Sequence, residues 1–499
     1  MNASHDPDRV YDAIIVGSGA GGAAAAYRLV QAGLEVLLVE KGRELPRDAT
    51  TLDVQAVVHE GRFKSREPWR DGAGRLLVPE EYFNVGGKTR WYGAALLRYS
   101  TGEFHADATH QCRGWPIAAA DLQPYYEQAE RLLGVRRFEP EPGLRRIAER
   151  LARAPSAWQA EPLPMGLAAG ILGNEREARH FDGFASPAGL KGDARASFLD
   201  RVRDAPNLAV RTEDAVTELV AAPARPARVE GVRTASGVVH RARHVLLAAG
   251  ALHTPRLVQK YVADHGLESV LPCARHVGRN LKLHLLTAVV GVGATRQDDL
   301  LRKTTLFTHP ELPHSSVQPL GFDGELIAGL IPRLVPRPLA RLLGAHAYGF
   351  FLQTEDGSHP DNRVEWAGAG GAPLLDYDAR RVAPALAEHT ALVSRFRSAL
   401  VRAGLLAFSQ RIGLAGTAHA CGTMIAGHNP ADSVVDADGR VHGMDGLYVV
   451  DGSVLPRSSR VNPSLSIYGW SLRVADRLAL ANPGHRQPAD VGGIEALSA

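Results

Sequence analysis

Two short apolar runs near the start of the chain, residues 12–16 and 36–39, lack the alternating polar positions of a half-exposed strand. Such runs are typical of parallel strands that are buried on both faces. Between them, residues 23–31 predict a helix that ends at Gly33. The pattern therefore predicts a strand–helix–strand unit in which the two strands pair in parallel.

The first predicted strand runs directly into a glycine-rich turn at residues 17–22. Gly17 permits the tight turn, Gly19 lets the backbone approach a pyrophosphate, and Gly22 lets the following helix pack closely on the sheet. An anion would be bound there by the unpaired N–H groups and the positive dipole end of the helix. Glu40 follows the second strand, where ribose hydroxyls would be hydrogen-bonded. The motif therefore predicts dinucleotide binding.

The same kind of pattern returns later in the chain. Strands are predicted at residues 207–211 and 215–221, a hairpin at 229–234 and 237–240, a buried strand at 245–249 and a strand at 446–453. A helix is expected from Thr254-Pro255, because proline is tolerated in a first helical turn, and another at 464–480. Together these elements predict a doubly wound sheet whose sequence is interrupted by another domain.

The interrupting sequence differs in character. Residues 134–184 are rich in Pro, Arg and Ala, and residues 285–411 alternate short strands with loops. We therefore predict an α/β protein in which a doubly wound, Rossmann-like domain comprises residues 1–133, 185–284 and 412–499. A second, discontinuous α+β domain comprises residues 134–184 and 285–411.

Two further stretches predict contacts with a ligand or partner. Residues 85–93 concentrate glycine beside aromatics, which suits backbone passing close to a flat cofactor ring, although a hairpin turn is the alternative. Residues 326–343 are apolar but carry Arg333, Arg337 and Arg341, and prolines prevent one long helix. Three roles stay open for this segment: a lid or wall over the substrate, an oligomer contact, or contact with a membrane surface.

The chain of 499 residues is too long for one core and has an ordinary globular composition. Its net charge of +3 is not concentrated in a run, which gives no support to nucleic-acid binding. Cys112, Cys273 and Cys421 are odd in number and widely spaced, which favours a reducing compartment over a disulfide framework. No apolar stretch approaches the roughly 20 residues of a membrane span, and residues 1–10 leave no room for a signal peptide. We therefore expect a cytoplasmic protein.

A series of short sequence blocks extends over nearly the whole chain. These are GSGAGG (17–22) with Glu40, VGGKT (85–89), GWPIAAADLQPYY (114–126), AAGALHTP (248–255), VGRNLKLH (277–284), HPDNRVEW (359–366), HACGTMIAG (419–427), VDGSVLP (450–456) and NPSLSIYGWSLRVADRL (462–478). In order and separation they resemble the glucose–methanol–choline (GMC) oxidoreductase family, whose members bind FAD. The resemblance implies that the first predicted domain binds FAD and that the second is a substrate-binding cap.

The resemblance also implies the residues of the site. His419 and Asn462 stand where family members place a catalytic pair that faces the flavin. The residues expected to bind FAD are Gly17, Gly19, Ala20, Gly22, Glu40, Lys41, Gly86, Gly87, Thr89, Val216, Ala249, Gly250, Asp451, Gly452, Asn462 and Pro463. The chain departs from the family pattern after Gly422-Thr423, where Met-Ile replaces the usual Arg-Met. Relatives that attach FAD covalently use a His in the Gly-Gly segment, whereas this chain has Arg90 and Trp91, so we expect non-covalent FAD.

Alcohol oxidation needs a base for the hydroxyl proton and an acceptor for the hydride, and imidazole and flavin suit these two tasks. We therefore expect oxidation of a CH–OH group of a sugar or glycoside to the ketone or aldehyde. His419 would take the proton while Asn462 donates a hydrogen bond to the same oxygen. Oxidation of a sterol or other bulky alcohol, a lyase with an idle flavin, and a flavin-containing binding or electron-transfer component are the alternatives. The electron acceptor, which would be oxygen or a quinone or artificial acceptor, stays open, as does a homo-oligomer.

Other chemistries have little support in the sequence. Cys421 lies close to His419, but nothing else in the chain supports a Cys–His nucleophile, and no GxSxG elbow is present. His428 and His442 have no spacing that resembles a metal site. We therefore predict no metal.

Overall fold

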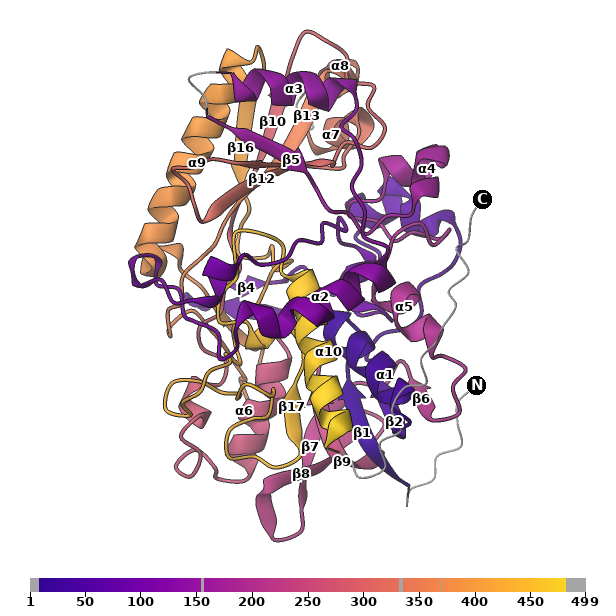
Figure 1. Cartoon of the computed structure of the whole chain (residues 1–499), viewed down its shortest axis with the longest axis vertical. Coiled ribbons are helices and arrows are strands. Elements are labelled where there is room, and N and C mark those ends of the chain that lie inside the picture. The colour runs from indigo at the N-terminus through magenta and orange to yellow at the C-terminus, as the bar shows by residue number, and fades with distance from the viewer. Residues whose placement is uncertain (1–8, 154–156, 332–334, 369, 482–499) are drawn as a thin grey trace.

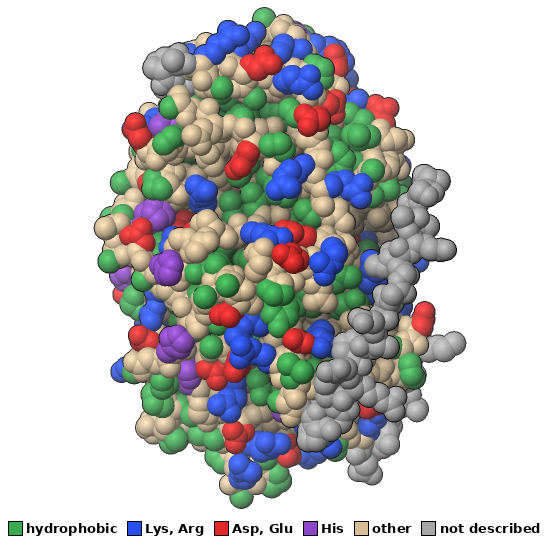
Figure 2. All heavy atoms as spheres, viewed as in Figure 1, with side chains coloured by type: hydrophobic (Ala, Val, Ile, Leu, Met, Phe, Trp, Pro, Cys, Tyr) green, Lys and Arg blue, Asp and Glu red, His purple; other side chains and the backbone are tan. Residues whose placement is uncertain are grey.

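The computed structural model of the chain describes residues 9–153, 157–331, 335–368 and 370–481. The molecule is elongated, with a mainly parallel sheet in its lower half and an antiparallel sheet in its upper half (Figure 1). The chain passes between the halves several times, so segments from both ends and from the middle of the sequence lie together in the lower half. On the face shown in Figure 2, basic and acidic side chains are interspersed.

The first sheet has the strand order β6-β2-β1-β9-β8-β7, and β17 pairs with β9. Its strands are β1 (Val10–Val16), β2 (Val36–Val39), β6 (Leu208–Arg211), β7 (Val216–Ala222), β8 (Arg225–Thr234), β9 (Val239–Leu247) and β17 (Leu447–Val449). β1 pairs in parallel with β2 and with β9, and β2 pairs in parallel with β6. The predicted doubly wound fold is confirmed. The hairpin β8–β9 is also present, but its second strand continues unbroken into the strand predicted at 245–249.

Helices pack around this sheet. α1 (Ala20–Gln31) contacts β1 and β2, and α10 (Ser464–Leu480) packs on both α1 and α2 (Ala119–Leu133). Four consecutive alanines of α1, residues 23–26, are fully buried, and their small side chains allow close approach to these neighbours. α6 (Thr254–Asp264) carries proline in its first turn, as predicted, and contacts β7.

The second sheet is antiparallel, with the order β16-β10-β13-β12-β11-β5. Its strands are β5 (Gln159–Pro162), β10 (Leu285–Val292), β11 (Thr305–Thr308), β12 (Ser315–Pro319), β13 (Ala347–Thr354) and β16 (Leu406–Arg411). Side chains alternate along β13, so that Tyr348, Phe350 and Leu352 enter a core formed with α3 (Pro142–Ala152) and α9 (Ala383–Arg402). Phe351 and Gln353 therefore belong to the opposite face of this sheet.

A small third sheet has the order β14-β15-β3-β4, and short helices connect the larger elements. Its strands are β3 (Trp69–Asp71), β4 (Leu76–Leu77), β14 (Arg363–Glu365) and β15 (Leu374–Asp376), and the short helices are α4 (Glu175–Arg179), α5 (Ala194–Ser197), α7 (Gly324–Leu330) and α8 (Arg337–Ala345). Among the residues described, no helix combines the length and the apolar character needed to cross a bilayer.

Residues 285–411 hold more regular structure than the expected short strands and loops, since α9 alone has 20 residues. Its buried residues, Ala385, His389, Leu392 and Phe396, recur every three or four positions, which is the spacing of one helical face. Both segments predicted for the second domain supply strands to the second sheet, whereas β15 pairs with β3 from the first predicted domain. The domain boundaries stay a prediction.

Gly21 of α1 lies against the segment that follows β17. A Cβ at Gly21 would lie 1.9 Å from the carbonyl oxygen of Val450. We expect Gly21→Ala to lower the free energy of unfolding by about 1–3 kcal/mol, the usual range for an overpacked core, because α1 must move away from β17. Denaturant titration followed by circular dichroism measures this loss. Gly102→Ala is the matched control, since a Cβ there would meet no atom within 4 Å. Equal losses in the two variants would contradict the importance of this contact.

Candidate active site

A cavity of about 480 Å³ lies at the carboxyl ends of β1, β2 and β9 and reaches Phe351 of the second sheet. In doubly wound sheets, ligands bind at this edge, where the strand order reverses. The predicted site residues that line the cavity are Gly17, Gly19, Ala20, Glu40, Lys41, Gly87, Thr89, Val216, Ala249, Gly250, His419, Asp451, Gly452, Asn462 and Pro463. The predicted residues Gly22 and Gly86 are not part of the lining and contact the residues that form it.

The glycines of the glycine-rich turn have different structural roles. Gly17 has a φ of +99°, and a Cβ there would lie 2.5 Å from the carbonyl oxygen of Ala248. A Cβ at Gly22 would lie 1.8 Å from the carbonyl oxygen of Gly17, so both residues are required by the packing of the turn. A Cβ at Gly19 would meet no protein atom within 4 Å, and Gly19 lines the cavity. Gly19 therefore leaves room for a ligand at the N-terminus of α1, whose first turn has no acidic residue to compete with an anion.

Glu40 holds the glycine-rich turn through hydrogen bonds to its carboxylate. One of its carboxylate oxygens accepts hydrogen bonds from the Ser18 N–H at 2.9 Å and from the Ser18 hydroxyl at 2.5 Å. The other oxygen accepts the Gly42 N–H at 2.8 Å. Burial raises the pKa of Glu40, and these hydrogen bonds oppose the rise. The oxygen bonded to Gly42 keeps a second lone pair, which suits the ribose contact predicted for Glu40.

Residues 86–89 are attached to the same turn. The Gly86 N–H donates to the Ser18 hydroxyl oxygen at 3.0 Å, and the Thr89 hydroxyl donates to the Gly86 carbonyl at 2.6 Å. A Cβ at Gly87 would lie 3.1 Å from the Cα of Gly19. The stretch Gly87–Arg90 forms a 3₁₀ turn rather than the alternative hairpin. Backbone therefore borders the cavity on this side, as the glycine content predicted.

Asp451 links three parts of the chain. One carboxylate oxygen accepts the Ser453 N–H at 2.8 Å and the Ser453 hydroxyl at 2.5 Å. The other accepts the Gly250 N–H at 2.8 Å and the Thr254 hydroxyl at 2.5 Å. Burial raises the pKa of Asp451, and these four hydrogen bonds oppose the rise. Asp451 thus holds the start of α6 beside the C-terminal segment, while its contact with a cofactor stays a prediction.

His419 and Asn462 lie side by side in the cavity wall, with Nε2 of His419 3.3 Å from Nδ2 of Asn462. Burial lowers the pKa of His419 well below its usual value, and the neighbouring His284, Lys303 and Lys88 side chains lower it further. The neutral ring accepts the Asn462 amide at Nε2, so its proton belongs on Nδ1. Nδ1 is buried and has no hydrogen-bond partner among the described residues. Nε2 is therefore the basic atom that the pair presents.

Several side chains of this region were not predicted. Gln318 of β12 donates to Oδ1 of Asn462 at 2.6 Å. Lys303 and Asp182 form a buried ion pair at 3.0 Å, and both line the cavity. The ring of Phe351 lies 6.3 Å from that of His419. These are single residues in a part of the sequence without motifs, so no sequence pattern identified them.

The segment at 326–343 comprises most of α7 and α8, while residues 332–334 lie outside the described residues. Leu326 of α7 is buried in one apolar cluster with Trp91, which lines the cavity. This packing favours a wall beside the substrate. Leu342 of α8 is 57% exposed, so the alternatives of an oligomer contact and a membrane contact stay open.

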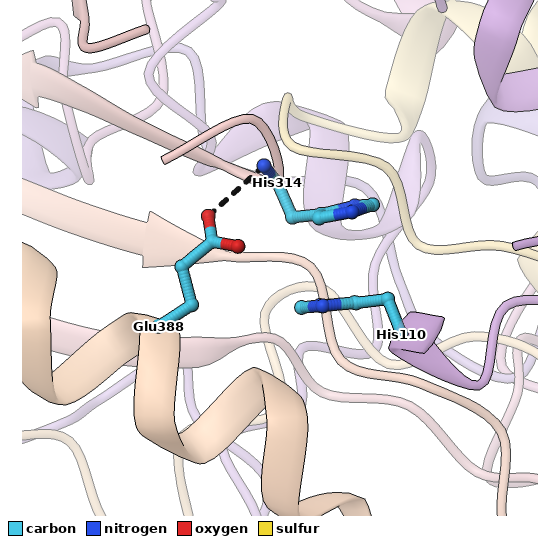
Figure 3. Close-up of side chains that lie close together, drawn as sticks. All are labelled: His110, His314 and Glu388. Atoms are coloured by element: carbon cyan, nitrogen blue, oxygen red, sulfur yellow. Dashed lines mark hydrogen bonds between the residues drawn. The ribbon is translucent and has the colours of Figure 1, made fainter. Parts of the chain in front are cut away.

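A second group of titratable side chains shares no residue with the cavity lining. His110, His314 and Glu388 bring possible metal ligands within 4.8 Å of one another, as do Cys112, His314 and Glu355. Figure 3 shows the two imidazoles face to face, with Glu388 accepting the backbone N–H of His314 at 2.9 Å. The ring centroids are 3.7 Å apart and the planes differ by 9°. An ion bound by imidazole lies in the ring plane, and these nearly parallel planes share no such point. This geometry concerns the His110–His314 pair, and the absence of a metal stays a prediction.

Residues 12–279 match the family model described as FAD dependent oxidoreductase, and residues 375–471 match the model described as GMC oxidoreductase. With the glycine-rich turn and the cavity at the strand ends, these matches define a FAD-dependent oxidoreductase. The chain belongs to the GMC oxidoreductase family, and its cofactor is FAD.

Two curated relatives resemble almost the whole chain. The 6'''-hydroxyparomomycin C oxidase of Streptomyces lividus is 32% identical over 95% of this chain and 92% of the relative. The paromamine 6'-oxidase of Streptomyces fradiae is 32% identical over the same shares, 95% and 92%.

Solved structures show the same fold. A formate oxidase variant of Aspergillus oryzae superimposes with a TM-score of 0.67 at 16% identity and covers 95% of this chain and 99% of that one. The pyridoxine 4-oxidase from Mesorbium loti gives a TM-score of 0.59 at 19% identity, covering 93% and 98%.

Replacement of Gly19 tests the phosphate turn. We expect Gly19→Val to abolish FAD binding while leaving the fold intact, because the added side chain would project into the cavity and touch no protein atom at its Cβ. FAD titration of the purified variant, followed by flavin fluorescence, measures binding, and circular dichroism checks the fold. A folded Gly19→Val protein with wild-type affinity for FAD would place the pyrophosphate elsewhere.

Proposed function

We propose that this enzyme oxidises a CH–OH group of a sugar or glycoside to the aldehyde or ketone, with His419 as the base. The observation that carries the proposal is the His419–Asn462 pair, 3.3 Å apart, in the same cavity as the phosphate turn. Relatives named as oxidases of paromamine and of a hydroxyparomomycin support a sugar-derived substrate. Amino-sugar glycosides are accordingly the first substrates to examine.

The geometry supports a separate task for each of the two side chains. The substrate hydroxyl enters between them, where it donates its proton to Nε2 of His419 and accepts the N–H of Asn462. Removal of that proton makes the carbon-bound hydrogen a better hydride donor. FAD, when bound, supplies the hydride acceptor. Since burial keeps His419 neutral, the base is ready to accept a proton without first losing one.

The cofactor would be held by the residues already located at the cavity. The N-terminus of α1 with Gly19 accommodates the pyrophosphate, and Glu40 accepts a ribose hydroxyl. Backbone of residues 87–89 and 249–250 borders the rest of the cofactor. We retain the expectation that FAD is not covalently attached.

The cavity wall also bears on the choice of substrate. Lys303 and Asp182 place a donor group and an acceptor group in the lining, and such groups suit the hydroxyls of a sugar. A sterol or other bulky alcohol would offer fewer hydroxyls to these two groups, which makes it the weaker alternative. A binding or electron-transfer component would make no use of the His419–Asn462 arrangement as a base. A lyase could use the base, but it would turn over its substrate without bleaching the flavin.

The proposal extends to the electron acceptor, the cellular compartment and the oligomeric state. Oxygen is the first electron acceptor to test, because both paromomycin-related enzymes are named oxidases, and a quinone or artificial acceptor is the alternative. The three cysteines are buried and free, which supports a reducing compartment, and we propose the cytoplasm. A homo-oligomer stays part of the proposal.

Substrate-dependent bleaching of the flavin tests the reaction. We expect anaerobic mixing with paromamine or other amino-sugar glycosides to bleach the flavin absorption, because hydride transfer reduces FAD. Neutral sugars and sterols are the comparison compounds. Turnover of a compound without bleaching would favour the lyase alternative, and bleaching by sterols alone would overturn the sugar assignment.

Removal of the base tests the mechanism. We expect His419→Ala to lower the rate of flavin reduction by roughly 10²–10⁴-fold, the usual range for a positioned base. Asn462→Ala should cost less, because it removes one neutral hydrogen bond and leaves the base in place. Anaerobic stopped-flow absorbance measures both rates, and FAD content is the control. Near wild-type reduction by a folded, FAD-loaded His419→Ala enzyme would remove His419 from the mechanism.

The pH dependence follows from the lowered pKa of His419. Only the neutral ring accepts a proton, so the rate of reduction rises with pH as the imidazolium loses its proton. Because this pKa is lowered, the rise is complete below the usual histidine value of about 6.5. Reduction rates measured across acid and neutral pH should therefore reach a plateau before pH 7. A rise centred above pH 7 would contradict a neutral buried base.

A further inference from the structure

The amide of Asn462 has two ends of nearly equal shape and opposite chemistry. Its Nδ2 donates hydrogen bonds and its Oδ1 accepts them. If Oδ1 faced His419, Nε2 would have to carry a proton in order to donate to it, and its lone pair would be lost to the reaction. The direction of this amide therefore decides whether His419 can act as a base.

Gln318 supplies the contact that distinguishes the two ends. It lies on β12 of the second sheet, is 1% exposed, and donates from Nε2 to Oδ1 of Asn462 at 2.6 Å. A donor on this side holds the amide oxygen, so Nδ2 is turned toward Nε2 of His419. We propose that Gln318 is a positioning residue that fixes the amide of Asn462 and so keeps Nε2 of His419 able to accept the substrate proton. The inference rests on the function proposed for His419 and Asn462.

Gln318 uses only one end of its amide in hydrogen bonds to the described residues. Its Oε1 is buried and has no hydrogen-bond partner among the described residues. A buried, unpaired amide oxygen costs about 1–3 kcal/mol, so an apolar side chain at this position would be more favourable for stability alone. The hydrogen bond from Gln318 to Asn462 offsets part of this cost.

Gln353 provides a matched control on the neighbouring strand. It is fully buried on β13, and its Nε2 donates to the Ser316 hydroxyl oxygen at 3.2 Å and to the Arg460 carbonyl at 2.7 Å. Its Oε1 is also buried and unpaired among the described residues. Gln353 thus shares the burial and the sheet of Gln318, while its hydrogen bonds go to groups other than Asn462.

The decisive variant is Gln318→Glu. An ionised carboxylate cannot donate and would accept Nδ2 of Asn462, which turns Oδ1 toward His419. Because burial raises the pKa of a carboxyl group, the variant is measured over a pH series that extends to alkaline pH, where the group is ionised. We expect the ring proton to move from Nδ1 to Nε2 and the rate of flavin reduction to fall by about tenfold or more. Nitrogen-15 NMR of histidine-labelled enzyme reports which ring nitrogen is protonated, and subtraction of the His419→Ala spectrum identifies the signal. This readout needs no substrate.

Three further variants complete the test. Gln318→Met removes the donor without reversing the amide, so reduction should fall less than in Gln318→Glu. Gln353→Glu and Gln353→Met should leave the proton of His419 on Nδ1, even though His284, Lys303 and Lys88 also influence this ring.

Wild-type proton placement and kinetics in Gln318→Glu would overturn the proposal. An equal proton shift in Gln353→Glu would also overturn it, since a buried charge alone would then be the cause. If Gln318→Glu does not fold, wild-type reduction kinetics in Gln318→Met overturn the proposal and a selective loss supports it. Failure of the proposed function is a separate result, because it appears as full activity of His419→Ala.

Discussion

The structure depends on the close approach of three backbone segments that are far apart in sequence. The start of α1 contacts the segment after β17 so closely that Gly21 leaves no room for a Cβ beside Val450. Asp451 then binds Gly250 and Thr254, so the end of β9 and the start of α6 join the same contact. The cavity lining includes residues of all three segments, namely Gly19, Ala20, Ala249, Gly250, Asp451 and Gly452. Gly17, Gly21 and Gly22 are therefore required by the packing of these segments.

Much of this half of the molecule could be predicted from the sequence, because strands buried on both faces appear as uninterrupted apolar runs. The predicted strand at 36–39 coincides with β2. The sequence pattern predicts two separate strands, 237–240 and 245–249, where the structure has the single strand β9. Arg241, Arg243 and His244 interrupt the apolar residues between the two predicted strands. In the structure, the first part of β9 alternates between buried and exposed positions, and its last residues are fully buried. β9 therefore combines an alternating pattern, where one face is exposed, with a continuous apolar pattern, where both faces are buried.

The proposed catalytic pair, His419 and Asn462, shows which site residues the sequence can and cannot identify. His419 and Asn462 belong to blocks that resemble a family, so they could be named in advance. Gln318, Lys303 and Asp182 lie in sequence without motifs, and only the folded chain brings them to the pair or its cavity, Gln318 from β12 and the other two from loops. In the proposed mechanism, reactivity at Nε2 of His419 is consequently set by both halves of the molecule. One half supplies the base and its amide partner, and the other half determines the direction of that amide.

The placement of β17 has a consequence for the way the chain acquires its fold. β17 adds to β9 only after about nine-tenths of the chain has been synthesised, and α10 packs on α1 later still. Contacts between such distant segments have a high loop-closure cost and form slowly. During synthesis, the edge of β9 and the apolar face of α1 are therefore exposed for most of the elongation time. Apolar surface left exposed in this way makes a nascent chain prone to aggregation until α10 has emerged and packed on α1.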